Sequence, residues 1–209
     1  MSRQIGLYMS AIIDFLVHCD ERLFFLVNGT LASNRLDSFM EEISVIGAWP
    51  IVLIALPSLA GDGKARFLRH IILLAAALFC LGWCVRTVKS VADRDRPAAH
   101  FAKELADGSV SIRFVERRIL ANNSMPSGHT ATAFCVMVYC ALRSRAGLWA
   151  YLGLATLIGY SRVYVGLHFP GDAMAGALLG TLLGTAGWQG YLFWARRRPL
   201  PPYTRTATL

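Results

Sequence analysis

Long apolar runs alternate with short polar connections along most of the chain. An α-helix rises 1.5 Å per residue, so about 20 apolar residues cross the roughly 30 Å hydrocarbon core of a bilayer. Five runs have this character, and they extend over Ile43 to Gly61, His70 to Val88, Ser127 to Leu142, Gly147 to Val165 and Ala173 to Trp194. The pattern predicts an all-α fold, a polytopic transmembrane helical bundle of five spans.

The N-terminal residues 5–27 show a different pattern, with polar side chains on one stripe of a helix. These polar positions recur every four residues, at Ser10, Asp14, His18 and Arg22. Together with the charges of Asp20 and Glu21, this pattern is typical of a helix at the membrane interface, and a sixth span is the alternative. A second amphipathic segment, Asn34 to Glu42, leads into the first apolar run.

The composition favours one integral membrane domain. Hydrophobic residues make up 55% of the 209 residues and charged residues 16%. We expect amphipathic helices in residues 1–42, the transmembrane core in 43–194 and a cytoplasmic tail in 195–209. The net charge of +8 does not indicate nucleic acid binding, because the basic residues gather where apolar runs end. The five cysteines lack CxxC spacing, so no zinc site or disulfide framework is predicted.

Basic residues in the short connections predict the orientation in the membrane. They are found in three places that fall on one side under the five-span topology, at Lys64, Arg66 and Arg69, at Arg143 and Arg145, and at Arg196, Arg197 and Arg198. By the positive-inside rule this side is the cytoplasm. The long polar segment from Lys89 to Met125 and the turn from Gly166 to Asp172 then share the external face.

Two motifs in or near that polar segment carry groups suited to an anion. In "KSVADRDRP", Lys89 and Arg96 are seven residues apart, close to two helical turns, so they can project in the same direction. In "NSMPSGHTATAF", Ser124 is placed to cap a helix, and Ser127 and Gly128 present backbone N–H groups at its start. His129 follows at once.

A third motif, "SRVYVGLHFPGD", surrounds the last turn. Arg162 lies near the end of a predicted span, and Pro170 is placed to open the next helix. His168 and Asp172 are four residues apart, which lets the carboxylate reach the imidazole across the helix start. A histidine held by a carboxylate is the arrangement of an oriented base or nucleophile.

The topology brings all three motifs to one membrane face. There, three fixed cations, Lys89, Arg96 and Arg162, match a doubly charged phosphate. The order and spacing of the motifs, Lys-x6-Arg-Pro, Pro-Ser-Gly-His and Ser-Arg-x5-His-x3-Asp, resemble those of the type 2 phosphatidic acid phosphatase superfamily. The motifs cover residues 89–172. The resemblance implies a helical bundle and a reaction that needs neither metal nor other cofactor.

The resemblance also implies a role for each motif residue. His168, oriented by Asp172, attacks phosphorus to form a phosphohistidine, and His129 protonates the leaving oxygen. The phosphate oxygens are bound by Lys89, Arg96, Ser127, the N–H of Gly128, and Arg162.

A phosphorylated membrane lipid is the expected substrate, and we expect the protein in a bacterial inner membrane with the site on the periplasmic or external face. The candidates are undecaprenyl diphosphate, lipid A phosphate, phosphatidylglycerol phosphate and phosphatidic acid. Relatives that act on undecaprenyl diphosphate often carry aspartate at the position of Gly128, which weakens that candidate. A lipid phosphotransferase using the same intermediate and a non-catalytic phosphate-lipid transporter are the alternatives, and the sequence makes no prediction of oligomeric state.

Overall fold

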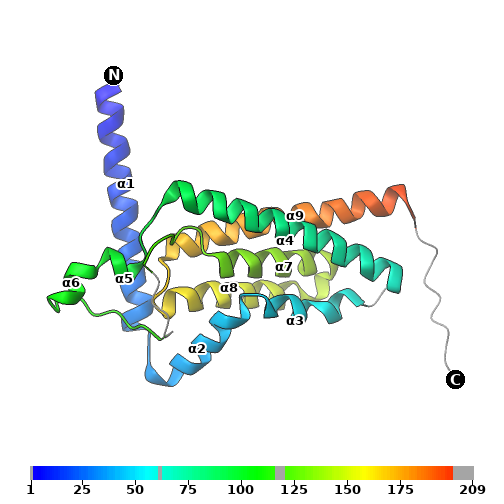
Figure 1. Ribbon diagram of the computed structural model, residues 1–209, viewed down its shortest axis with the longest axis horizontal. Helices are drawn as coiled ribbons and strands as arrows, with labels where there is room; N and C mark the ends of the chain where they lie inside the picture. The colour runs from blue at the N-terminus through cyan, green and yellow to red at the C-terminus, as the bar shows by residue number, and fades with distance from the viewer. Residues whose placement is uncertain (1, 61–62, 116–120, 200–209) are drawn as a thin grey trace.

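The computed structural model describes residues 2–60, 63–115 and 121–199, which form helices and irregular connections with no β-strand among them. Helices α4 (Lys64–Ala92), α7 (Gly128–Arg143), α8 (Leu148–Tyr164) and α9 (Pro170–Arg197) form a bundle, and α3 (Pro50–Leu59) packs on α7 (Figure 1). Helix α1 (Ser2–Phe25) crosses one end of the bundle in this view. The predicted all-α bundle is confirmed.

Shorter elements connect these helices. A π-helical turn, η1 (Leu26–Thr30), follows α1, and α2 (Asn34–Ile46) precedes α3. Helices α5 (Pro97–His100) and α6 (Ala102–Ala106) follow α4, and the turn η3 (Arg145–Gly147) joins α7 to α8. Buried Asn28 in η1 donates to the carbonyl oxygens of Tyr164 (2.7 Å) and Arg113 (2.8 Å). It thereby fixes the segment after α6 against the end of α8.

Four of the five predicted runs coincide with single helices, and the first does not. The segment predicted as a span from Ile43 to Gly61 begins in α2, breaks after Ile46 and continues in α3 after a bend of 67°. Pro50 is the physical reason, because it has no N–H to bond the carbonyl of Ile46 in a continuing helix. Gly61 lies outside the described residues.

Length and hydropathy determine which helices are able to cross a membrane. Among the described residues, the helical segment Lys64–Ala106, most of which is α4, is long and apolar enough to span a bilayer, and the bent α2–α3 pair is a second case if it counts as one span. Helices α7 and α8 have 16 and 17 residues, about 24–26 Å at 1.5 Å per residue. The five-span count therefore stays a prediction.

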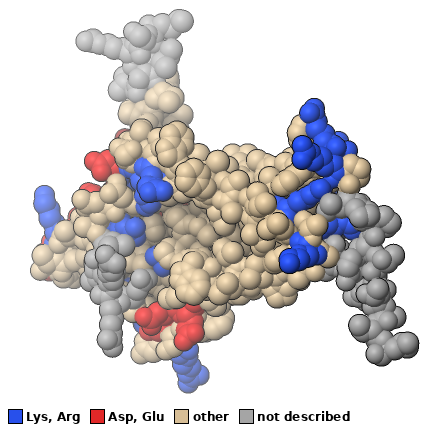
Figure 2. All heavy atoms as spheres, turned by 45° about the vertical axis from the view of Figure 1, so that its right-hand side comes forward, with Lys and Arg blue, Asp and Glu red and all other residues tan. Residues whose placement is uncertain are grey.

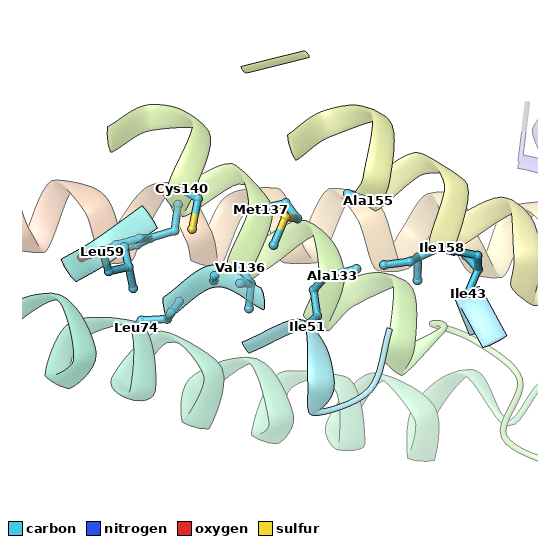
Figure 3. Packing of buried hydrophobic residues seen from close by; sticks show 12 residues of the cluster. Ile43, Ile51, Leu59, Leu74, Ala133, Val136, Met137, Cys140, Ala155 and Ile158 are labelled. Carbon is cyan, nitrogen blue, oxygen red and sulfur yellow. The ribbon is translucent and has the colours of Figure 1, made fainter. Parts of the chain in front are cut away.

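Helix α7 is the centre of the bundle. Its side chains Ala133, Val136 and Met137 are buried, and they face residues of α3, α4 and α8 such as Ile51, Leu74 and Ile158 (Figure 3). A helix surrounded on several sides must be small or apolar all round, as this sequence is. Burial of α7 fixes its N-terminal end, where Ser127, Gly128 and His129 lie.

Glycines let α9 approach α7 closely. Gly176, Gly180 and Gly184 recur every four residues on one face of α9. A Cβ at each would collide with a backbone carbonyl oxygen of the α7 segment, namely those of Ser127, Ala131 and Cys135. Small residues at this spacing are a common means of close helix packing in membranes. This contact sets Asp172, at the start of α9, beside the start of α7.

Gly180→Leu is therefore expected to destabilise the bundle by about 3 kcal/mol or more, since the clash is with backbone that cannot rotate away. The midpoint of thermal unfolding in detergent would measure this loss. Gly153→Leu, on α8, is the matched control, because a Cβ at Gly153 meets nothing within 4 Å. Equal midpoints for the two variants would contradict the role of the glycine face.

The bundle exposes large apolar side chains along its length, as a protein in lipid does. On α4 and α9 these include Phe79 (77% exposed), Trp83 (66%), Met174 (71%) and Leu178 (64%). Figure 2 shows most of the charged side chains on its face at the two ends, with Lys and Arg alone at one end and both signs at the other.

The three basic connections meet at one end of the bundle, as the predicted topology requires. Arg69 near the start of α4 donates to the carbonyl of Arg198 after α9 (2.7 Å), and Arg143 at the end of α7 lies 3.4 Å from His70 of α4. The motif residues lie toward the opposite end, near α1, α5 and α6 (Figure 1).

Candidate active site

His168 is held in the turn between α8 and α9 and is 2% exposed. Its Nδ1 lies 3.6 Å from Asp172 Oδ2 and 3.4 Å from Ser124 Oγ. Its Nε2 lies 3.3 Å from Arg96 Nη1. A guanidinium can only donate, so Nε2 acts as the acceptor and the ring proton belongs on Nδ1, facing the carboxylate. The lone pair of Nε2 therefore points toward a cation, where an anionic substrate would bind.

Asp172 is fully buried in the first turn of α9, which begins at Pro170 as predicted. Its carboxylate accepts hydrogen bonds from Ser124 Oγ and from the Phe169 N–H (2.8 Å), and it pairs with Arg94 (2.8 Å). Its backbone carbonyl accepts from the Ser127 N–H (2.9 Å). The distance from this carboxylate to His168 Nδ1, 3.6 Å, is slightly longer than a hydrogen bond.

The predicted phosphate-binding cations are anchored on neighbouring backbone. Arg96, 7% exposed, donates to the carbonyls of Asn122 and Leu167, both at 3.0 Å. Lys89 donates to the carbonyl of Asn123. Because Asn122 and Asn123 are adjacent, these contacts hold the two cationic side chains close together at the start of the second motif.

Arg162 reaches the same region from α8. It is 3% exposed and donates to Ser44 Oγ of α2. Its charge acts on His168, as does that of Arg96. The structure thus brings the three cations and the His168–Asp172 pair together from separate elements.

The second motif opens α7. Ser127 is the N-cap, and its Oγ accepts from the Thr130 hydroxyl (2.9 Å). Gly128 and His129 follow in the first turn and line a groove of about 450 Å³. Apolar side chains of α3 and α4 form most of the rest of the groove, among them Val52, Leu81 and Val85. The groove offers an apolar path that ends at His129.

The sequence interpretation of Ser124 was wrong. We expected it to cap α7, but Ser127 holds that position and Ser124 bonds Asp172. Its side chain, 0% exposed, closes the space between Asp172 and His168.

Three further residues were missed. Ser44 anchors Arg162, while Arg94 and Asp20 form a chain of ion pairs to Asp172. Asp20 and Glu21 were interpreted only as marks of an interfacial helix. The position of Arg94 inside the first motif could have suggested that it has a buried carboxylate partner. The sequence does not tell which carboxylate this partner is. Among the described residues, no group of three or more His, Cys, Asp or Glu is placed to hold a metal ion.

Burial lowers the pKa of the His168 imidazole to about 4, with Asp172 raising it and Arg96 and Arg162 lowering it. A lowered pKa keeps the neutral ring to lower pH, so we expect His168 to stay unprotonated throughout pH 5–7, where an ordinary histidine with a pKa of about 6.5 titrates. NMR of histidine-labelled protein in detergent, with His168→Asn for assignment, would measure it. A His168 midpoint near 6.5 would contradict the burial argument.

Comparisons with known proteins identify the family of the chain. A model of the PAP2 superfamily matches residues 70–196. The chain is 29% identical over 189 residues to the lipid A 4'-phosphatase of Bacteroides thetaiotaomicron, across 86% of this chain and 78% of that protein. It is 37% identical over 82 residues to the bacitracin transport permease protein BcrC of Bacillus licheniformis, a match that spans 37% of that protein.

Solved structures resemble the fold. The crystal structure of Aquifex aeolicus LpxE superposes with a TM-score of 0.65 at 25% identity, over 80% of this chain and 93% of that one. A transmembrane PAP2-type phosphatidylglycerolphosphate phosphatase from Bacillus subtilis gives 0.66 over 96% and 100%, and at 20% identity it supports the fold alone. The family match covers more than half of the chain, so the chain belongs to the PAP2 superfamily. It is a phosphoric ester hydrolase of that lipid phosphatase family.

Proposed function

We propose that the protein removes phosphate from a membrane lipid through a phosphohistidine on His168. The observation that carries this proposal is the orientation of the imidazole, with Nδ1 beside Asp172 and the Nε2 lone pair directed at Arg96. A nucleophile held by a carboxylate on one side and facing an anion-binding cation on the other is equipped for phosphoryl transfer.

The first step forms the phosphoenzyme. The Nε2 lone pair of His168 attacks phosphorus in line, and the bond from phosphorus to the lipid oxygen breaks as His129 gives that oxygen a proton. Asp172 stabilises the positive charge that develops on the imidazole. Charge on the phosphate oxygens is stabilised by Lys89, Arg96, Arg162, Ser127 and the Gly128 N–H.

The second step regenerates the enzyme. His129, now neutral, takes a proton from water as the water oxygen attacks phosphorus. The phosphorus–Nε2 bond breaks and His168 recovers its lone pair. Inorganic phosphate leaves, and the fixed cations do in both steps what a metal ion would do elsewhere.

The groove supports a lipid as the substrate. It joins the apolar surface of α3 and α4 to Gly128 and His129, so an acyl or prenyl chain lying in it would bring its phosphate ester to the acid. Since two relatives that match 86% and 89% of the chain are named lipid A 4'-phosphatases, lipid A phosphate is the first substrate to test. The charge pattern of the two ends supports an inner-membrane protein with this site on the external side.

Gly82→Phe should separate lipid from non-lipid substrates. Gly82 lines the groove, and a Cβ added there would meet only the end of the Arg86 side chain, at 3.9 Å, so the new ring would occupy the path of the lipid chain. We expect kcat/KM on a lipid phosphate to fall about 10–100-fold, with less than about a twofold change on para-nitrophenyl phosphate. Gly153→Phe, which lines a different hollow on α8, is the control. Equal losses on both substrates would argue against the groove as the lipid site.

A panel of four lipids tests the proposed function as a whole. Purified protein in excess EDTA is given lipid A, undecaprenyl diphosphate, phosphatidylglycerol phosphate or phosphatidic acid, and released phosphate is measured. We expect release from at least one of them, inhibited by vanadate, which resembles five-coordinate phosphorus. Release that stops with EDTA and returns with magnesium would contradict the proposed mechanism.

A further inference from the structure

Arg94 lies between two carboxylates that come from distant parts of the chain. Its Nη1 is 2.8 Å from Asp172 Oδ1, and its Nη2 is 2.7 Å from Asp20 Oδ2 of α1. The three side chains are 25%, 0% and 13% exposed for Arg94, Asp172 and Asp20. Short pairs shielded from water in this way hold their geometry better than surface pairs.

Aromatic packing also orients the guanidinium. The Arg94 group lies 4.3 Å from the centre of the Phe169 ring, within the range of a cation–π contact. Phe169 is fully buried against Phe24 of α1, with ring centres 5.3 Å apart. Arg94 is therefore fixed from three sides, and two of these contacts depend on α1.

Asp20 has a second partner at the start of α9. Its Oδ1 accepts the backbone N–H of Gly171 (2.6 Å), one of the donors that the first turn of a helix leaves without an internal partner. A Cβ at Gly171 would lie 3.0 Å from Asp20 Oδ2, so the glycine permits this close approach. A carboxylate is also favoured at a helix N-terminus by the helix dipole. Asp20 thus contacts both Arg94 and the turn that carries Asp172.

We propose that Asp20 and Arg94 are positioning residues for phosphoryl transfer, a relay by which α1 fixes the Asp172 carboxylate that orients His168. This inference rests on the proposed role of His168 as the nucleophile. The N-terminal helix α1 then contributes to the active site, although it lies outside the region that the family model matches.

The groups around Asp172 determine how loss of the relay would show. His168, Ser124 and the Phe169 N–H face the carboxylate from the turns, Arg94 faces it from the α4–α5 connection, and the charge of Asp172 acts on Lys89 of α4. Arg94 also pairs with Asp20, and Glu21, the next residue along α1, pairs with His100 (2.8 Å). Removing Arg94 takes away a positive charge that lies beside Asp172. The pKa of the Asp172 carboxylate would then rise, so it would bind a proton at higher pH.

Steady-state kinetics of three variants on para-nitrophenyl phosphate test the relay. Arg94→Ala is expected to lower kcat on the order of 10–100-fold with KM within about twofold, and to move the acidic limb of kcat/KM to higher pH. Arg94→Lys should recover part of kcat, because an ammonium can pair with one carboxylate but cannot bridge two. The isosteric Asp20→Asn should lower kcat by less than Arg94→Ala, about 3–10-fold.

Arg113→Ala is the matched control, since it breaks an ion pair of the same length, with Asp37 (2.7 Å), that does not touch Asp172. We expect its pH profile to match that of the wild type. An unchanged kcat and acidic limb in both Arg94→Ala and Asp20→Asn, with His168→Ala inactive, would overturn the relay alone. Equal kcat losses in Arg113→Ala and Arg94→Ala would also overturn it, whereas an active His168→Ala would remove the proposed function instead.

Discussion

His168→Ala is expected to lower kcat by more than about 10⁴-fold on every phosphate ester, because without Nε2 no phosphoenzyme forms. The remaining cations can still bind phosphate, so the affinity for vanadate or inorganic phosphate should fall far less than turnover. Phosphate release and vanadate binding measured on the same preparation would separate the two effects.

A matched histidine outside the site controls for the substitution itself. His18 of α1, with a side chain 61% exposed, is replaced by alanine in parallel, and this variant should keep wild-type turnover. Hydrolysis by His168→Ala within about tenfold of the wild type would remove His168 as the nucleophile, since catalytic bases and nucleophiles contribute at least about 10²-fold.

His129→Ala should show a loss that depends on the leaving group. A lipid alkoxide is a poor leaving group and needs a proton as its bond to phosphorus breaks, so kcat on a lipid phosphate should fall about 10²–10⁴-fold. Para-nitrophenolate leaves without protonation, so formation of the phosphoenzyme from that ester should be nearly preserved. A burst of nitrophenol followed by slow turnover is the expected time course.

The burst also tests the second role of His129. With no base to activate water, the phosphoenzyme should accumulate. The amplitude of the nitrophenol burst should then approach one nitrophenol per protein. Equal losses on both esters, with no burst, would contradict the role of His129 as the proton donor.

Local spacing allowed most of the site to be predicted. His168 and Asp172 are four residues apart across a helix start, and Lys89 and Arg96 are seven apart, so the sequence constrained each pair directly. The structure brings these pairs together with Arg162, while the catalytic and binding roles remain predictions. The glycine face of Gly176, Gly180 and Gly184 also has a spacing visible in the sequence.

Contacts between distant segments could not be predicted from the sequence. Asp20 and Arg94 are 74 residues apart, and Arg94 and Asp172 are 78 apart; their pairing depends on how α1 crosses the bundle. The break at Pro50 was missed for another reason, because mean hydropathy over a window is the same whether an apolar run is straight or bent. Side-chain chemistry was therefore easier to predict than the path of the chain that carries it.

The role of His168 as the nucleophile is tested by finding where the phosphate is bound during turnover. Protein mixed with a phosphate ester is quenched within one turnover under alkaline conditions, where phosphohistidine survives, and the phosphorylated peptide is sequenced by mass spectrometry. We expect a single phosphate on His168, absent in His168→Ala and increased in His129→Ala. Phosphate on any other residue would contradict this role of His168. The absence of any phosphoenzyme while the ester is being hydrolysed would contradict it as well.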